Sequence, residues 1–306
     1  MRTVWVTGAA GFSGIHLVRY LRNLGKGLRI VGLDVAEAEP PDIDAYARVD
    51  LLIPEAVTEL ARREPPAWVI HLAGCMPPAS QEAMWNANVG GTIGLLVGLW
   101  KADLPGVRVV SVGSAAEYEP PADGFVTEQC PGPGPSAYGR SKWAQSMLAL
   151  QMSGQAGIEL MVTRVFNLIG PRLPTRLVAG ALCAQFVDPT STVVRVGNTS
   201  TRRDFVDVRD AVAAYWSVAE RGRPGETYNV CSGRPVSVES VLGMLAEAAG
   251  RSPRIEMDAA RLRANDPAVV FGDNAKIRQA TGWTASIPLT ESLRDMISAA
   301  RQAAAR

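Results

Sequence analysis

The stretch TGAAGFSG, from Thr7 to Gly14, directly follows the apolar residues Val4–Val6 and constrains the fold more than any other part of the chain. It indicates a buried strand, a glycine turn and a helix whose first unpaired N–H groups, near Phe12 and Ser13, would face phosphates. Gly8 allows a tight turn, Gly11 lets a pyrophosphate approach bare backbone, and Gly14 allows close packing of the helix. The stretch therefore predicts a dinucleotide-binding turn.

The next strand supplies an acid of the kind that binds an adenosine ribose. Strand Arg29–Leu33 is followed by Asp34, which stands 20 positions after Gly14. A carboxylate at that position accepts hydrogen bonds from the ribose diol and repels a 2′-phosphate. We therefore expect NAD(H) to be favoured, with NADP(H) as the alternative. A glycine turn beside an ordinary surface acid is the simpler structural interpretation.

The composition excludes several classes of protein. Hydrophobic residues make up 47% and charged residues 20% of the 306 residues, as in ordinary globular proteins. A net charge of +1 gives no electrostatic reason to expect nucleic acid or a membrane surface as a partner. The four cysteines and two histidines lack metal-ligand spacing, so we expect no metal. Because the first strand begins at once and no apolar run could span a bilayer, we expect a cytoplasmic protein with reduced thiols.

Strands and helices alternate through the first half of the chain. The expected helices are 13–24, 54–63, 81–101 and 136–153, and the expected strands after the first are 29–33, 68–72, 107–112 and 159–166. With short connections, this alternation predicts an α/β fold, a doubly wound parallel sheet with helices on both faces. The segment 120–135 is rich in Pro and Gly and is expected to be a loop.

The pattern loosens after residue 166 and predicts a second, smaller part. We expect residues 1–166 to form a dinucleotide-binding Rossmann domain, to which residues 204–231 return with a helix and a strand. Residues 167–203 and 232–306 would form a discontinuous C-terminal α/β lobe that binds the substrate. The cleft between the two would lie at the carboxyl ends of the strands, where doubly wound folds bind ligands.

Tyr138, Lys142 and Ser114 form the set of residues that points to a reaction. The tyrosine and the lysine are four residues apart on an expected helix, so their side chains share one face. An ammonium beside a phenol favours the phenolate, so we expect the pKa of Tyr138 to be lowered toward neutrality. Such a tyrosine can exchange a proton with a sugar hydroxyl or ketone during hydride transfer, and Ser114 would donate to the same oxygen. A solvated helix face is the simpler interpretation.

The sequence resembles the extended short-chain dehydrogenase/reductase family, the NAD-dependent nucleotide-sugar epimerases, dehydratases and reductases. The resemblance covers nearly the whole chain. It is carried by TGAAGFSG, Asp50-Leu51, HLAG at 71–74, NVGGT at 88–92, YGRSK at 138–142, FNLIGP at 166–171 and RRDFVDVRD at 202–210. Within the family, the second half is similar to enzymes of GDP-sugar metabolism, the GDP-mannose 4,6-dehydratases and the GDP-6-deoxy-4-keto-mannose reductases.

This resemblance implies roles for further residues. Besides the glycine turn and Asp34, the residues expected to bind the cofactor are Asp50 and Leu51 at the adenine, Leu72, Ala73, Gly74, Asn88, Tyr138 and Lys142, with Asn88 supporting the site rather than reacting. The residues expected to bind a nucleotide-diphosphate sugar in the lobe and beside it are Ser114, Asn167, Val178, Arg203 and Arg263, the two arginines at the diphosphate or ribose. The family also implies a homodimer.

The residues after Ser114 distinguish between reactions of this family. A 4,6-dehydratase needs an acid/base carboxylate, and in that branch a Glu stands two residues after the Ser or Thr. That position is Ala116 in this chain. Glu117 is one residue further on, where a strand end points to the opposite face, so we expect it to be structural. His71 is expected to be a packing residue and Cys75 an inert thiol.

We therefore expect a cytoplasmic NAD(P)H-dependent 4-ketoreductase of a nucleotide-diphosphate 6-deoxy-4-ketohexose, with GDP as the expected nucleotide. Hydride would come from the nicotinamide and the proton from Tyr138. A nucleotide-sugar 4-epimerase with tightly bound NAD⁺ would use the same residues and is the alternative. A sugar-nucleotide dehydratase and a non-catalytic NAD-binding protein are further interpretations of the same fold.

Overall fold

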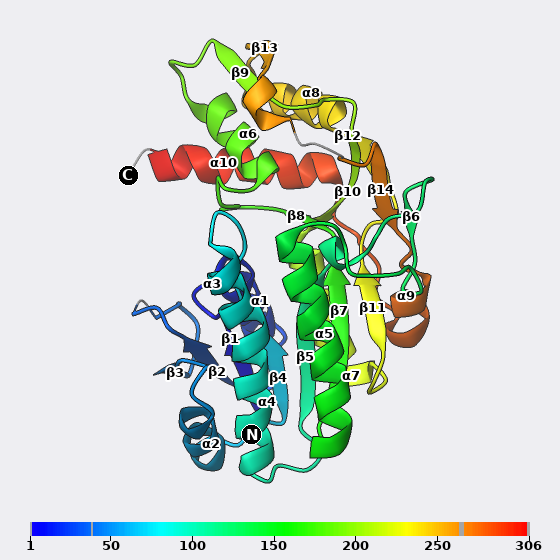
Figure 1. Cartoon of the computed structure of the whole chain (residues 1–306). Helices are drawn as coiled ribbons and strands as arrows, with labels where there is room; N and C mark the ends of the chain where they lie inside the picture. Colours follow the sequence, from blue (N-terminus) through cyan, green and yellow to red (C-terminus); the bar gives the residue numbers. More distant parts are fainter. Residues whose placement is uncertain (1, 38, 263–265, 305–306) are drawn as a thin grey trace.

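A seven-stranded parallel sheet lies at the centre of the computed structural model, which describes residues 2–37, 39–262 and 266–304 (Figure 1). Its strands are β1 (Thr3–Thr7), β2 (Arg29–Asp34), β3 (Ala45–Arg48), β4 (Trp68–His71), β5 (Arg108–Ser114), β7 (Glu159–Val165) and β11 (Thr227–Val230). They pair in the order β11-β7-β5-β4-β1-β2-β3, all parallel. The strand order reverses between β1 and β4, and a doubly wound fold binds its ligand at the carboxyl ends of the strands at such a point.

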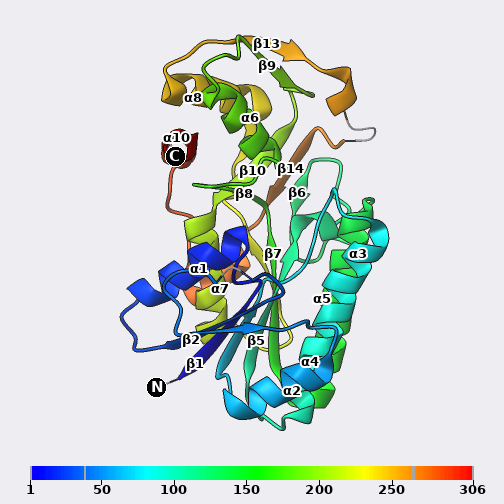
Figure 2. The ribbon, with the colours of Figure 1, turned by 90° about the vertical axis from the view of Figure 1, so that its left-hand side faces the viewer.

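Helices cover both faces of this sheet (Figure 2). On one face lie α1 (Phe12–Asn23) and α7 (Val208–Arg221), and on the other α2 (Pro54–Arg63), α4 (Gly91–Lys101) and α5 (Ala137–Ala156). Val4 and Val6 of β1 belong to the core under α1 and α7, while Trp5 between them belongs to the core under the other helices. Because a strand covered on both faces must be apolar throughout, the run VWV is explained, and the prediction of a doubly wound sheet is confirmed.

A smaller lobe lies beyond the carboxyl ends of the large sheet (Figure 1). Three helices pack there around their own apolar core: α6 (Val178–Val187), α8 (Val238–Ala249) and α10 (Leu289–Ala304). One mixed sheet joins β8 (Asn167–Ile169), β10 (Arg202–Asp207), β12 (Pro235–Ser237), β14 (Val269–Gly272) and β6 (Phe125–Val126), and a separate pair joins β9 (Val193–Val196) and β13 (Arg254–Met257). The segments that build the lobe are discontinuous in sequence, as predicted.

One part of the C-terminal third does not belong to the lobe. Helix α9 (Ala275–Thr281) packs beside α7 and β11 at the edge of the large sheet. Ile277 and Trp283 are buried in the core under α1 and α7, and the indole of Trp283 donates to the carbonyl oxygen of Asp210 at 2.9 Å. The range 232–306 therefore contributes to both parts of the molecule, because an apolar anchor after β14 brings the chain back to the sheet before α10.

The predicted helix 81–101 is interrupted. It consists of α3 (Gln81–Trp85), a π-helical turn at Asn86–Gly90 and α4. The predicted loop 120–135 contains the two-residue strand β6, which pairs with β14 of the lobe. Strand β3 at the sheet edge was not expected, since its residues AYAR lack an apolar run. Within the described residues, no helix is long and apolar enough to cross a bilayer.

Helix α4 packs against α2 and the residues before it without room for a side chain at two of its glycines. A Cβ atom on Gly94 would lie 1.9 Å from the carbonyl oxygen of Leu51, and one on Gly98 would lie 2.5 Å from Cβ of Val57. At Gly94, helix α4 is therefore in direct contact with the backbone next to Asp50. These two glycines are therefore fixed by packing rather than by turn geometry.

We expect Gly94→Ala to lower the free energy of unfolding by about 2 kcal/mol, because backbone atoms must move to admit the methyl group. Gly243→Ala is the matched control. Gly243 is exposed in α8 with open space around it, so alanine should raise the free energy of unfolding by about 0.5 kcal/mol. Urea unfolding followed by circular dichroism measures both, and equal effects of the two substitutions would contradict the packing.

Candidate active site

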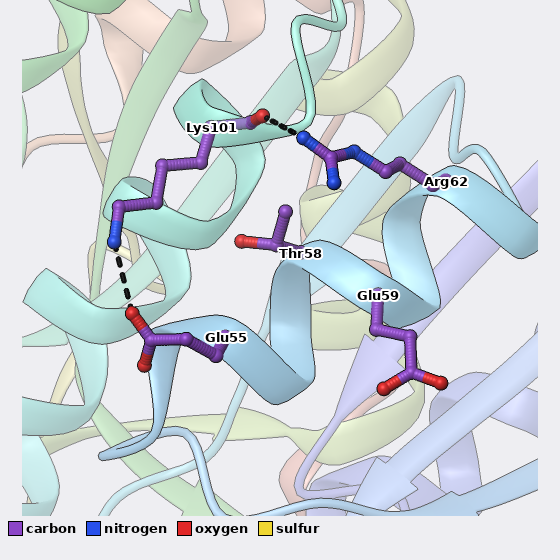
Figure 3. A pocket seen from close by; sticks show the side chains of 5 residues that line it. All are labelled: Glu55, Thr58, Glu59, Arg62 and Lys101. Carbon is purple, nitrogen blue, oxygen red and sulfur yellow. Dashed lines mark hydrogen bonds and ion pairs between the residues drawn. The ribbon is translucent and has the colours of Figure 1, made fainter.

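A surface pocket of about 430 Å³ lies between α2 and α4, away from the predicted residues (Figure 3). Its two cations have partners within the protein: Lys101 Nζ lies 2.9 Å from Glu55 Oε1, and Arg62 donates to the carbonyl oxygen of Lys101 at 3.0 Å. In Figure 1, α2 and the end of α4 lie at the end of the sheet remote from the lobe. The predicted residues lie at the other end, where β1, β4 and β5 finish.

The glycine turn after β1 has the shape that a pyrophosphate requires. Gly8 has φ +67°, which favours glycine, and a Cβ atom on Gly14 would lie 2.2 Å from the carbonyl oxygen of Gly8. Helix α1 begins at Phe12, and among the described residues no side chain caps it. The first N–H groups of a helix have no partner within it. The backbone around Gly11 and Ser13 therefore fits the phosphates of a dinucleotide.

Asp34 holds the end of β2 against this turn. One carboxylate oxygen accepts from the backbone N–H of Ala10 at 3.0 Å, and the other accepts from that of Val35 at 2.8 Å. The side chain is half-exposed, and its oxygens have lone pairs beyond those used here. Its place fits the predicted contact with a ribose. Arg48 on the neighbouring strand pairs with Glu37 at 3.0 Å.

Of the other predicted cofactor residues, three follow β4 and two follow β3. Leu72, Ala73 and Gly74 follow β4 and lie beside the turn, since a Cβ atom on Gly8 would lie 2.9 Å from the backbone nitrogen of Ala73. Asp50 is exposed, and its carboxylate accepts from the N–H of Leu52 at 2.9 Å. The structure shows a packing role for Leu51. Its side chain is buried in the core under α2 and α4, so its own fixed role in the structure is packing.

His71, predicted to be a packing residue, is the centre of a buried hydrogen-bond chain. The Thr7 hydroxyl lies 2.7 Å from His71 Nδ1, the Thr92 hydroxyl lies 2.8 Å from His71 Nε2, and Thr92 donates to the carbonyl oxygen of Asn88. Because Thr92 uses its proton on Asn88, it must accept from Nε2–H, so Nδ1 accepts from Thr7. Burial lowers the pKa of His71 to about 3, so the ring is neutral at neutral pH. Thr7 in turn accepts from the N–H of Ala73 at 3.1 Å.

Asn88, in the π-helical turn, continues this chain toward α5. Its side-chain oxygen accepts from the N–H of Cys75 at 2.8 Å, and its nitrogen donates to the carbonyl oxygen of Cys75 and to the Ser141 hydroxyl. Ser141 donates to the carbonyl oxygen of Tyr138 at 2.8 Å. Asn88 is fully buried, so it holds the loop after β4 against α5 instead of presenting a surface to the cofactor.

Tyr138 and Lys142 lie one turn apart near the start of α5, but the predicted lowering of the tyrosine pKa is wrong for this structure. Burial raises the pKa of Tyr138 to about 12, with the Ser114 side chain acting in the opposite direction. Lys142 Nζ donates to the carbonyl oxygen of Val112 at 2.7 Å and to Gln145 Oε1 at 2.5 Å, and burial lowers its pKa to about 8. Two of the three ammonium protons are thus used elsewhere, and the phenol holds its proton at neutral pH.

Glu117 is buried, as expected for a structural residue. Its carboxylate accepts from the N–H of Ser114 at 2.7 Å and from Arg164 Nε at 2.7 Å. Burial raises the pKa of Glu117, while Arg164 and the Ser114 N–H lower it. The carboxylate is therefore bound inside the protein, and Ala116 stands at the position that a dehydratase acid would need.

The residues predicted to bind substrate lie in and below the lobe. Asn167 is exposed at the start of β8 and donates to the carbonyl oxygen of Asp204 at 2.9 Å, and Val178 is exposed at the start of α6. Arg203 of β10 donates to Asp266 at 2.7 Å. Arg263 lies outside the described residues. The structure thus gives Arg203 an anionic partner that sequence reasoning missed, as it missed Gln145, which lies three residues after Lys142 on the same helix face.

We expect Thr92→Val to lower the free energy of unfolding by about 2 kcal/mol more than Thr92→Ser, because valine leaves the buried Nε2–H of His71 without a partner. Serine keeps the hydroxyl and loses one methyl group. Urea unfolding of the two variants measures the difference. A valine variant as stable as the serine variant would contradict the hydrogen-bond chain.

The chain is similar to known proteins over most of its length. The model of the NAD dependent epimerase/dehydratase family matches residues 4–231. GDP-6-deoxy-D-mannose reductase of Pseudomonas aeruginosa is 31% identical over 308 residues, which cover 96% of each chain. The structure of RMD from Pseudomonas aeruginosa complexed with NADPH has a TM-score of 0.87 at 29% identity, covering 99% of this chain and 100% of that one.

An epimerase is also similar in structure. UDP-glucose 4-epimerase of Thermus thermophilus, in complex with NAD, has a TM-score of 0.84 at 25% identity and covers 98% of this chain and 99% of that one. The range matched by the family model contains the glycine turn, Ser114, Tyr138 and Lys142. The chain belongs to the NAD dependent epimerase/dehydratase family, whose members are NAD(P)-dependent enzymes that modify nucleotide sugars.

Proposed function

We propose that this protein is an NAD(P)H-dependent 4-ketoreductase of a nucleotide-diphosphate 6-deoxy-4-ketohexose, with GDP as the nucleotide. The observation that carries the proposal is an arrangement of three side chains: Ser114 ends β5, and Tyr138 and Lys142 stand one turn apart at the start of α5, with the Tyr138 phenol next to the Ser114 hydroxyl. A reductase must begin its reaction with a proton to give. The similarity over 96% of each chain to a GDP-6-deoxy-D-mannose reductase supports the choice of sugar and nucleotide.

The residues of this chain would divide the proton transfer among them. Bound nicotinamide would supply the hydride. Tyr138 gives its proton to the carbonyl oxygen of the substrate as that oxygen gains negative charge, and the Ser114 hydroxyl donates a hydrogen bond to the same oxygen. The Lys142 ammonium, fixed by Val112 and Gln145, offsets the charge left on the phenolate.

Elimination of water is not supported by the structure. A dehydratase needs a carboxylate that opens on the sugar, whereas Glu117 is fully buried and bonded to Arg164. An epimerase remains the second candidate, because the similarity to UDP-glucose 4-epimerase covers nearly the whole chain and the same three residues serve both reactions. The two differ in whether cofactor is consumed.

Asp34 supports NADH as the cofactor, although the similar RMD structure holds NADPH. The carboxylate stands where the adenosine ribose is expected, and a 2′-phosphate there would meet its negative charge. Arg48, the neighbouring cation, is paired with Glu37 on the surface.

We expect the purified protein to oxidise NADH in a one-to-one ratio with GDP-6-deoxy-4-keto-D-mannose. Tyr138→Phe should lower kcat by about 10³-fold, because the proton donor is lost, and should leave the thermal stabilisation by NADH unchanged. Tyr20→Phe, on α1, is the control and should keep full activity. Turnover that survives in Tyr138→Phe would contradict the proton donor. Purification with tightly bound NAD⁺, and 4-epimer formation without net NADH consumption, would favour the epimerase.

We expect Asp34→Asn to increase kcat/KM for NADPH relative to NADH by about tenfold, because the amide removes the repulsion of a 2′-phosphate. Glu37→Gln, an exposed acid three residues later, is the control and should leave the ratio unchanged. Initial rates at several concentrations of each cofactor measure the ratio. An unchanged ratio in Asp34→Asn would show that Asp34 does not face the adenosine ribose.

A further inference from the structure

The buried ammonium of Lys142 is held by two acceptors that carry no charge. Its Nζ donates to the backbone oxygen of Val112, on β5, at 2.7 Å and to Gln145 Oε1 at 2.5 Å. Lys142 and Gln145 are 6% and 1% exposed. An ammonium taken out of water loses its hydration, so acceptors inside the protein must replace it. Gln145 is one of the two acceptors that the described residues provide for it.

The side chain of Gln145 is also fixed at its other end. Because an ammonium can only donate, the amide oxygen must face Lys142, and the amide nitrogen then faces Ser111. Gln145 Nε2 donates to Ser111 Oγ at 3.2 Å. Ser111 is buried on β5 as the register partner of His71 on β4. The amide therefore lies between the sheet and the lysine, and its two partners set its orientation.

The third proton of the ammonium is left for the site. Gly74, in the loop after β4, passes close to Nζ, since a Cβ atom on this glycine would lie 4.0 Å from it. Gly74 is one of the residues expected to bind the cofactor, and Tyr138 stands one turn before Lys142 on α5. With two protons directed to Val112 and Gln145, the tetrahedral geometry of the ammonium fixes the direction of the third.

The ammonium keeps its charge in this arrangement. Burial lowers the pKa of Lys142 to about 8, so the group remains protonated at neutral pH, and two neutral acceptors favour the protonated form without adding a negative charge. Three titratable side chains on other elements lie close enough to interact with it. His71 is neutral and Cys75 keeps its proton, because burial lowers the pKa of the first and raises the pKa of the second. The third, Glu117, is bonded to Arg164.

We propose that Gln145 is a positioning residue for Lys142: its side-chain oxygen holds the buried ammonium against β5 without neutralising its charge, so that the remaining N–H is directed to the site beside Gly74. A carboxylate at this place would hold the lysine and cancel its charge, whereas an apolar side chain would leave the charge without the hold. The use of this proton and this charge in a reduction rests on the proposed function. The hold of Gln145 on Lys142 does not.

The direct test is the ionisation of Lys142 in the protein without cofactor or substrate. Lysine labelled with carbon-13 at Cε gives few nuclear magnetic resonance signals, because the chain has four lysines, Lys26, Lys101, Lys142 and Lys276. The variant Lys142→Met identifies the signal to follow. In Gln145→Leu, Lys142 should lose its proton about one pH unit lower than in the parent protein, because an acceptor that favours the charged form is lost while burial remains. An unchanged or higher value would overturn the proposal.

Two further variants make the result specific. In Gln145→Glu the value should rise by about one pH unit, because the carboxylate accepts the same proton and adds a negative charge. This variant keeps the shape of the side chain, so it decides the matter if the leucine variant does not fold, and an unchanged or lower value would overturn the proposal. Gln151→Leu, an exposed position on the same helix, is the matched control and should leave the titration unchanged. A side chain that only filled space would move the titration in neither Gln145 variant.

Kinetics separate the hold from the charge. If GDP-6-deoxy-4-keto-D-mannose is reduced, Gln145→Leu and Gln145→Glu should each lower kcat about tenfold, the first because the ammonium is no longer held and the second because its charge is cancelled. Gln151→Leu should keep the parent kcat. If the parent protein reduces no ketone, the proposed function fails, and the titration still decides the role of Gln145. Full kcat in both Gln145 variants, with the titration moved as expected, would overturn the use of the held ammonium in the reaction.

Discussion

The carboxyl edge of the large sheet depends on one constraint: polar side chains buried there must find their hydrogen-bond partners within the protein. His71 lies between Thr7 and Thr92, Asn88 between Cys75 and Ser141, and Lys142 between Val112 and Gln145. These contacts join the ends of β1, β4 and β5 to α4 and α5. Through Ser141 and Lys142 this network fixes the start of α5, which carries the Tyr138 phenol, whereas Ser114 is held by its own contacts with Glu117 and Ala116.

Burial also sets the protonation states on which the proposed reaction depends. It raises the pKa of Tyr138 to about 12 and lowers that of Lys142 to about 8, so at neutral pH both groups carry their protons. A protonated phenol next to an ammonium is the starting state for giving a proton to a ketone. This protonation state is the one that the proposed reduction requires.

The large sheet and the glycine turn could be predicted from the sequence, because strands covered on both faces are apolar throughout and the turn needs glycine at set positions. Local pattern did not predict the π-helical turn at Asn86–Gly90, whose Asn88 is bonded to Cys75 and Ser141, residues distant in the sequence. The tyrosine pKa was predicted with the wrong sign, because helical spacing places Lys142 near Tyr138 but does not show that its protons go to Val112 and Gln145. The sequence did not predict that Trp283 packs against the large sheet, because its partner Asp210 is also distant in the sequence.

In the proposed reaction, one carbonyl group of the sugar receives a proton from Tyr138 and a hydride from the nicotinamide. The most direct measurement uses NADH deuterated at nicotinamide C4 with GDP-6-deoxy-4-keto-D-mannose, followed by nuclear magnetic resonance of the product. The account predicts deuterium at C4 of the hexose and in no other position. Deuterium at another carbon, or a reduced hexose without deuterium when both C4 hydrogens of the NADH are deuterium, would contradict it.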